Sequence, residues 1–406
     1  MVSVCMYFHA HQPHRLKRYG MFDIGVHSEY FDEEANKRIL DKVSHKCYHP
    51  TNSLLRELID EHAGDFKVSF SITGTILDQL EKHRPDILET FKDLAATGHV
   101  EFVSETYYHS LAYQFSKEEF EHQVEMHRAK IKEHFGQDPQ VFRNTELIFN
   151  NELASHVEKM GFTGILAEGA DHILGWRSPN FVYRATSTES IKVLLKNYKL
   201  SDDIAFRFSN KGWEEHPLSV EKYVDWINQN NGNGELVNLF MDYETFGEHQ
   251  WEDTGIFEFL RHLPRAVLAH PDNDFVTVSE AVNRYEVRGE FDAHHFISWA
   301  DLERDLSAWL GNPLQDRSIE ALYKLEKRIK ATGDERLIRD WRWLTTSDHF
   351  YYMCTKWFTD GDVHKYFNAF DSPYEGFIAF MNALHDVELR LKEYEKAQEP
   401  ETVQTT

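Results

Sequence analysis

Residues 1–13 read MVSVCMYFHAHQP, an apolar run that gives way abruptly to histidine, glutamine and proline. The first eight residues are apolar except for Ser3. A nearly continuous apolar run of this length lacks the alternation of a half-exposed strand, so it is typical of a strand covered on both faces. The segment predicts a buried strand over residues 1–10 with a polar carboxyl end that begins at His9.

Six further apolar segments of strand length follow, at 66–73, 98–104, 140–146, 162–168, 190–197 and 235–242, and a shorter one lies at 275–278. Helical patterns alternate with them at 51–62, 116–135 and 150–160, and Ser116 with Glu119 forms a capping-box signature. This alternation favours an α/β fold in which helices cover a parallel sheet. Seven strands favour barrel-like closure over an open sheet.

The pattern changes to helices alone after about residue 290. Amphipathic helical spacing is found at 298–310, 318–332, 335–356 and 374–396. We therefore expect a barrel-like domain at 1–290, a helical domain at 291–396 and a polar tail at 397–406.

The composition excludes several classes of protein. A hydrophobic content of 41% is enough for a packed core, which argues against general disorder. The formal net charge of −24 disfavours binding to nucleic acid or to an anionic membrane. Three cysteines without a CxxC pair predict neither a disulfide framework nor a zinc ribbon. No signal peptide, membrane span or nucleotide-binding glycine motif is recognisable, so we expect a cytoplasmic protein without a cofactor.

Polar and acidic side chains follow five of the predicted strands, at 9–13, 104–109, 144–146, 168–169 and 242–247. The carboxyl ends of parallel strands in a barrel meet at one edge, where active residues gather. Two carboxylates on one cleft can hydrolyse a glycosidic bond, one attacking the anomeric carbon and the other protonating the leaving oxygen. A single strand-end carboxylate is more often a helix cap or a loop ion pair, so the joint pattern carries the argument.

Five motifs occur in order along the chain: HQP at 11–13, GHVEF at 98–102 with YYH at 107–109, FRNTE at 142–146, MDYETFG at 241–247 and LTTSDHFYYM at 344–353. Together they resemble the five signatures of glycoside hydrolase family 57, most closely those of its intracellular α-amylase group. The resemblance spans residues 1 to about 357. One departure concerns the third motif, because many members have a tryptophan where this chain has Phe142 and Arg143.

The resemblance implies an incomplete TIM-like (β/α)7 barrel followed by a C-terminal helical domain that completes the cleft. It also implies a retaining glycoside hydrolase acting on α-1,4-glucans, of α-amylase type. By carry-over from the motifs, Glu146 is the nucleophile and Asp242 the general acid/base. A retaining pair predicts carboxyl groups about 5–5.5 Å apart.

His9 and His11 lie two residues apart on a strand, so they share one face. We expect both to contact sugar hydroxyls. Histidine pairs also bind metals, but the first strand has no Asp or Glu to complete a metal site, so none is predicted. The alternative is a pair of buried structural histidines.

Further substrate contacts are expected from Glu105, His109, Glu244, Trp299 and Asp348. Without the family resemblance, Asp348 would be interpreted as an ordinary surface charge on a helix. Stacking platforms for sugar rings are expected among Trp251, Trp299, Trp309 and Trp357.

Three other functions remain open at this point. A 4-α-glucanotransferase would use the same residues and differ only in the acceptor of the second step. A metal-dependent carbohydrate deacetylase would require a bound metal, and a silent glucan-binding protein would require an inactive site. The expected partner is an α-glucan or malto-oligosaccharide, with no nucleic acid and no membrane. The sequence does not indicate an oligomeric state.

Overall fold

The chain forms two compact units, each made of three separate segments. The first unit comprises Met1–Gln12, Lys37–Tyr107 and Glu121–Asp305, and the second comprises Pro13–Asn36, Tyr108–Phe120 and Leu306–Thr406. The computed structural model describes residues 2–356 and 368–398 of the chain. This division differs from the expected domain boundary at residue 290, which cuts strand β10 (Val287–Phe291). Residues 399–406 of the expected tail lie outside the described part.

The described strands of the first unit form two five-stranded sheets, of which the first is entirely parallel. Its order is β3-β2-β1-β8, with β9 also paired to β1. The members are β1 (Val2–Ala10), β2 (Val68–Ile72), β3 (Val100–Phe102), β8 (Leu236–Asp242) and β9 (Asn273–Phe275). Every residue of β1 that the structure describes is buried, as its apolar run predicts.

The second sheet has the order β10-β6-β7-β5-β4, with β6 antiparallel to β7 and the other pairs parallel. Its strands are β4 (Val141–Arg143), β5 (Gly164–Glu168), β6 (Val182–Ala185), β7 (Lys192–Lys196) and β10. Hydrogen bonds link it to the first sheet at two places. Ser104 N–H donates to Val141 O (3.0 Å), and Asn197 N–H donates to Asn238 O (2.9 Å). The expected α/β fold is confirmed.

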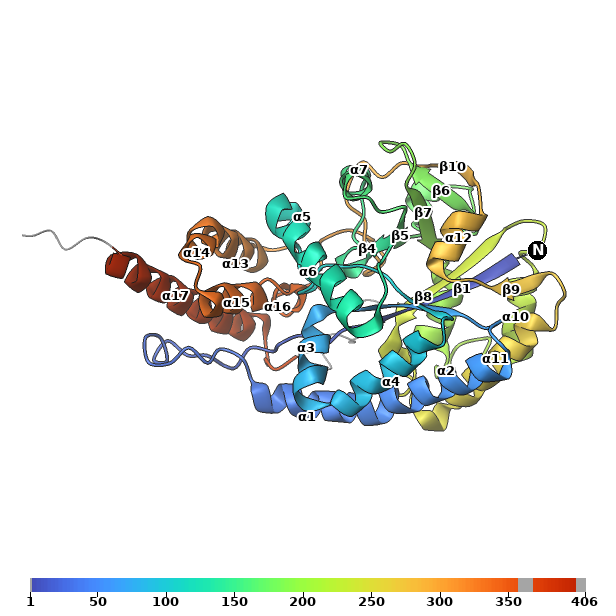
Figure 1. Ribbon diagram of the computed structural model, residues 1–406, viewed down its shortest axis with the longest axis horizontal. Helices are drawn as coiled ribbons and strands as arrows, with labels where there is room; N and C mark the ends of the chain where they lie inside the picture. The colour runs from blue at the N-terminus through green and yellow to red at the C-terminus, as the bar shows by residue number, and fades with distance from the viewer. Residues whose placement is uncertain (1, 357–367, 399–406) are drawn as a thin grey trace, which may run out of the picture. The chain divides into compact units, whose positions relative to one another are not determined.

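Helices follow most of these strands and pack on one another as well as on the sheets. Helix α2 packs against α4 and α11, α10 packs against α11, and α12 lies across β5 and β7 (Figure 1). The helices lying wholly in this unit are α2 (His49–Glu61), α3 (Gly74–His83), α4 (Pro85–Ala96), α7 (Asn151–Lys159), α8 (Asp171–Leu174), α9 (Tyr198–Asp202), α10 (Val220–Asn228), α11 (Ile256–Leu268) and α12 (Val278–Arg284). Two more, α1 (Glu33–Val43) and α6 (Lys117–Phe135), have residues in both units.

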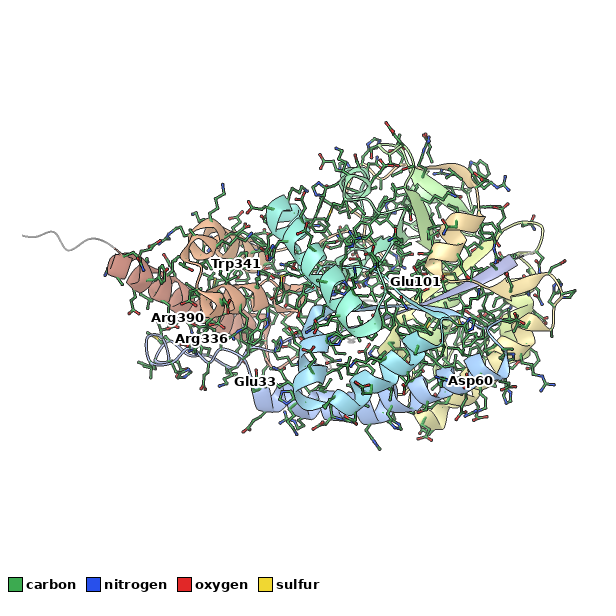
Figure 2. The ribbon with its side chains drawn as sticks, viewed as in Figure 1. Glu33, Asp60, Glu101, Arg336, Trp341 and Arg390 are labelled. Carbon is green, nitrogen blue, oxygen red and sulfur yellow. The ribbon has the colours of Figure 1, made fainter. Side chains whose placement is uncertain are left out.

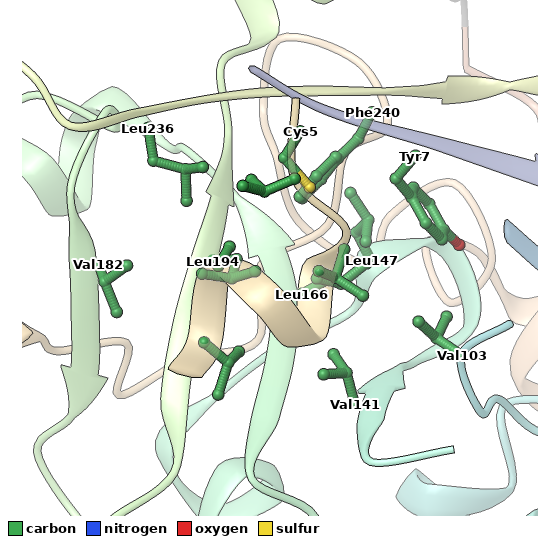
Figure 3. Packing of buried hydrophobic residues seen from close by; sticks show 14 residues of the cluster. Cys5, Tyr7, Val103, Val141, Leu147, Leu166, Val182, Leu194, Leu236 and Phe240 are labelled. Atoms are coloured by element: carbon green, nitrogen blue, oxygen red, sulfur yellow. The ribbon is translucent and has the colours of Figure 1, made fainter. Parts of the chain in front are cut away.

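Side chains from several strands and from α12 meet in the core of the first unit, which Figure 3 shows from close by. Tyr7 and Phe240 contact edge to face, with ring centroids 5.3 Å apart. The cluster contains Cys5, Tyr7, Val103, Val141, Leu147, Leu166, Val182, Leu194, Leu236, Phe240, Val276, Val278, Ala281 and Val282. Burial raises the pKa of the Cys5 thiol, which acts here as a small apolar group.

The second unit is helical and buries two large tryptophans, Trp309 and Trp341. Figure 2 labels Trp341 on α15 and Arg390 on α17, where the Arg390 guanidinium lies 2.7 Å from Asp340. Its helices are α5 (Ala112–Phe115), α13 (Pro313–Lys324), α14 (Glu326–Thr332), α15 (Glu335–Trp343), α16 (Ser347–Tyr351) and α17 (Pro373–Gln398). Across the described residues, no helix is both long and apolar enough to cross a lipid bilayer.

The expected helix over 298–310 is wrong, because the chain there forms bends and turns. Asp301 and Arg304 have φ angles of 53° and 51°, which a right-handed helix cannot accommodate. The expected helix over 335–356 is two helices, since the backbone near Thr346 bridges to Ser110 instead. Strands β6 and β10 were not expected from the sequence.

Candidate active site

Glu146 follows β4 in a short turn, η2 (Thr145–Leu147), and its backbone is strained. Its φ of 57° lies in the left-handed region that residues other than glycine rarely adopt. Trp299 holds the residue twice, since its backbone N–H donates to Glu146 O (3.2 Å) and its indole N–H donates to Glu146 Oε2 (2.7 Å). The carboxylate is therefore buried, and the indole N–H of Trp299 orients it.

Asp242 is the last residue of β8 and lies opposite His9 in the parallel register with β1. Its Oδ1 is 3.5 Å from His9 Nδ1, and its side chain keeps 33% of its exposure. A sugar can therefore reach Asp242 from solvent, whereas Glu146 is only 5% exposed.

His9 lies next to both Asp242 and Trp299. Its Nε2 lies 3.4 Å from Glu105 Oε2, opposite the nitrogen that faces Asp242. Its ring stacks at 6.0 Å on His11 and meets the ring of Trp299 edge-on at 6.4 Å. His11 is partly exposed, and its Nδ1 hydrogen-bonds to Thr73 Oγ1 at 2.9 Å. The expected shared face of the two histidines is confirmed.

Glu105 is fully buried behind His9 and lies 3.6 Å from the guanidinium of Arg143. Its backbone N–H donates to His127 Nδ1 (3.3 Å), while His127 Nε2 donates to Ile72 O (2.8 Å). Burial lowers the pKa of His127, which favours the neutral ring, and its two hydrogen bonds place the proton on Nε2. These contacts hold Glu105 in place at the end of β3.

Glu244 lies in the turn η4 (Tyr243–Thr245) directly after Asp242. Its Oε1 accepts hydrogen bonds from the Tyr48 hydroxyl and from Gln12 Nε2 (3.4 Å). Burial, and then the nearby charge of Asp242, raise the pKa of Glu244 to about 7. A carboxyl group that titrates near neutrality beside a second carboxyl group is typical of glycosidase sites.

The structure brings three charged residues to this site that had no role predicted from the sequence: Arg143, Lys196 and Arg304. Two cations lie over the Trp299 ring, with Arg143 Cζ at 5.1 Å and Lys196 Nζ at 5.3 Å from its centroid. Arg304 donates a hydrogen bond to Trp299 O. Lys196 ends β7, so the strand-end rule that singled out Glu146 could also have found it.

His109 and Asp348 belong to the second unit, where both are buried. His109 has a φ of 50°, and its carbonyl accepts the N–H of Ser347 at the start of α16. The structure therefore brings the turn at His109 next to the helix that carries Asp348.

The four expected stacking tryptophans have different environments. Trp299 lies at Glu146, and Trp309 is fully buried in the second unit and cannot meet a sugar there. Trp251 is 54% exposed beneath Lys46, and Trp357 lies outside the described residues. Trp176, which the sequence analysis did not single out, is 95% exposed after α8.

Comparison with protein families identifies the group to which this site belongs. The model of glycosyl hydrolase family 57 matches residues 5–294, which is most of the chain. The chain belongs to glycosyl hydrolase family 57. It is accordingly a glycoside hydrolase, and the resemblance noted from its five motifs is confirmed.

Relatives of family 57 are found among curated proteins and among solved structures. A protein of Methanocaldococcus jannaschii with a provisional α-amylase name is 47% identical over 398 residues, which is 95% of this chain and 84% of the relative. The branching enzyme of Pyrococcus horikoshii superposes with a TM-score of 0.68 at 15% identity, over 99% of this chain and 92% of its own. The 4-α-glucanotransferase of Thermococcus litoralis gives 0.63 at 18%, over 86% and 56%. At these identities the structural matches support the fold alone.

Proposed function

We propose that this family 57 member is a retaining glycoside hydrolase of α-amylase type that acts on α-1,4-glucans. The observation that carries the proposal is the fixed carboxylate of Glu146, held by the indole N–H of Trp299 at 2.7 Å. Asp242 supports it as the second, exposed carboxyl group, reached from Trp299 through His9. The provisional α-amylase name of the Methanocaldococcus jannaschii relative supports the substrate class.

In the first half-reaction, a carboxylate oxygen of Glu146 attacks the anomeric carbon. The glycosidic C–O bond breaks while Asp242 gives its proton to the leaving oxygen, and a glycosyl ester forms. In the second, Asp242 takes a proton from water, the water oxygen attacks the same carbon, and Glu146 leaves as a carboxylate. Two inversions give net retention of configuration.

Other side chains are assigned to substrate binding. His9, His11 and Glu244 offer hydrogen-bonding groups at the ends of β1 and β8, and Trp299 offers its ring. His109 and Asp348 are assigned the same role within the second unit. Glu105, expected to contact substrate, is fully buried and is assigned to support His9 from behind. No step of this mechanism requires a metal or an organic cofactor.

The proposed fold is the incomplete (β/α)7 barrel that the family resemblance implies. Seven strands, β1, β2, β3, β4, β5, β7 and β8, are consecutive neighbours when the two hydrogen-bonded links between the sheets are included. Placing Glu146 and Asp242 on β4 and β8 of one such barrel puts both at its carboxyl-terminal edge.

A product time course with maltoheptaose tests the function. Wild-type enzyme is compared with Glu146→Gln and Asp242→Asn, and with Glu152→Gln as a control on the exposed side of α7. We expect shorter oligosaccharides whose first-formed anomer is α by NMR, and a loss of at least a thousandfold in kcat for the two site variants alone. Longer oligosaccharides would instead identify a 4-α-glucanotransferase. An active Glu146→Gln enzyme or a first-formed β anomer would refute the mechanism.

A further inference from the structure

Glu168, the last residue of β5, is a fully buried carboxyl group to which the mechanism gives no role. Its Oε2 lies 3.9 Å from Lys196 Nζ and 3.8 Å from Arg304 Nη1, so neither cation is within hydrogen-bonding distance. Ion pairs at these distances do not offset the free energy that a carboxylate loses when it is removed from water, so Glu168 is not expected to stabilise the fold. Its presence therefore calls for another explanation.

The two cations that face Glu168 both contact Trp299. Lys196 Nζ lies 5.3 Å from the centroid of the indole ring, and Arg304 Nη1 donates to the Trp299 carbonyl oxygen. Lys196 is also held from α9, where its Nζ donates to Asp202 Oδ1 (2.9 Å). Glu168 therefore faces two cations that both contact Trp299: Lys196 lies over its ring, and Arg304 binds its backbone carbonyl.

Trp299 in turn holds Glu146, because its indole N–H and its backbone N–H both donate hydrogen bonds to that residue. We propose that Glu168 is a positioning residue for Glu146, acting through Lys196, Arg304 and Trp299. The inference rests on the proposed role of Glu146 as nucleophile. Glu168 does not touch substrate in this arrangement, because its side chain is fully buried.

The charge of Glu168 makes the effect dependent on pH. The charged groups that face it are Lys196 on β7, Arg304 in the loop after Trp299, and Asp202 on α9. Burial raises the pKa of Glu168 to about 7, although Lys196 and Arg304 oppose the shift. As pH falls through that value, the carboxylate gains a proton, the cations lose their counter-charge and Trp299 is held less firmly.

Glu168→Gln preserves the shape of the side chain and removes its charge. With maltoheptaose at pH 8 we expect kcat to fall about tenfold with KM within twofold, as displacement of a reacting group would produce. We also expect the wild-type loss of rate below about pH 7 to be absent from the variant, since Gln does not titrate. A wild-type kcat together with an unchanged pH profile would overturn the proposal.

Glu119 supplies a matched control in the second unit, where it is fully buried with Arg342 Nε at 2.9 Å and Lys330 Nζ at 2.8 Å. Glu119→Gln likewise removes the charge of a buried carboxylate that faces two cations, here at close range, so we expect it to lower stability and leave kcat and its pH profile unchanged. If both Gln variants lower kcat alike, the effect of Glu168 is general destabilisation and the proposal fails.

A double-mutant cycle with Trp299→Phe tests the route of the effect. Because Phe lacks the indole N–H, we expect Glu168→Gln to change kcat less than twofold in that background. If Glu168→Gln still lowers kcat about tenfold in the Trp299→Phe background, Glu168 does not act through Trp299. Glu146→Gln, assayed in parallel, separates the two hypotheses: an active Glu146→Gln enzyme refutes the proposed function, whereas an inactive one beside a normal Glu168→Gln enzyme refutes only the positioning role.

Discussion

Glu168→Gln should make the protein more stable at alkaline pH, although we expect it to slow the reaction. In the folded chain burial raises the pKa of Glu168 to about 7, from an ordinary value of 4.5. The folded state therefore binds this proton more tightly than the unfolded state does. The corresponding stability is present below pH 4.5 and is lost as pH rises through about 7.

The magnitude follows from the size of that shift. About 2.5 pH units, at about 1.36 kcal/mol each, amount to roughly 3 kcal/mol between acid and alkaline conditions. Because Glu168 is fully buried, no reduction for solvent screening applies. Relative to wild type, the variant should gain about 3 kcal/mol between pH 4.5 and pH 8, or about 6 °C in Tm for a domain of this size.

Differential scanning calorimetry of both proteins at pH 5, 6, 7 and 8 measures this difference. We expect the two Tm values to be similar at pH 5 and to diverge as pH rises, with the variant melting at the higher temperature. Glu119→Gln should instead melt below wild type throughout, because it loses close ion pairs with Lys330 and Arg342. If Glu168→Gln loses most stability at pH 8, the carboxylate is net stabilising and the reasoning is wrong.

Three further predictions concern the proposed general acid Asp242, the hydrophobic core of the first unit and metal dependence. Glu244→Gln removes a negative charge beside Asp242, so the alkaline limb of the kcat/KM profile should move to lower pH; an unmoved limb would show that the two are not coupled. Leu236→Ala empties part of the buried core and should cost about 2–5 kcal/mol in urea unfolding, with kcat unchanged. Dialysis against EDTA should leave kcat within twofold; a loss restored by Zn²⁺ would favour the deacetylase alternative.

The strands were predictable because most are buried on both faces. All seven expected strands are present within a few residues, four in the first sheet and three in the second. Parallel strands buried on both faces are rich in apolar residues, which makes them recognisable in the sequence. Strand β6 contains Arg184, and β10 contains Arg288 and Glu290, so neither is recognisable as an apolar run. The helix expected over 298–310 failed because tertiary hydrogen bonds at Ile297 and Trp299 override its local spacing.

The order of the strands, their polar carboxyl ends and the five family motifs are legible in the amino-acid sequence, because each depends on residues that are neighbours along the chain. Burial and side-chain contacts depend instead on residues that are far apart along the chain. Trp299 is 153 residues from the carboxylate that it holds, and Lys196 and Arg304 reach it from two other segments. Burial in the folded chain raises the pKa of Glu244 and that of Glu168 to about 7, and neither shift can be predicted from the sequence, because loss of hydration is set by what packs around a group.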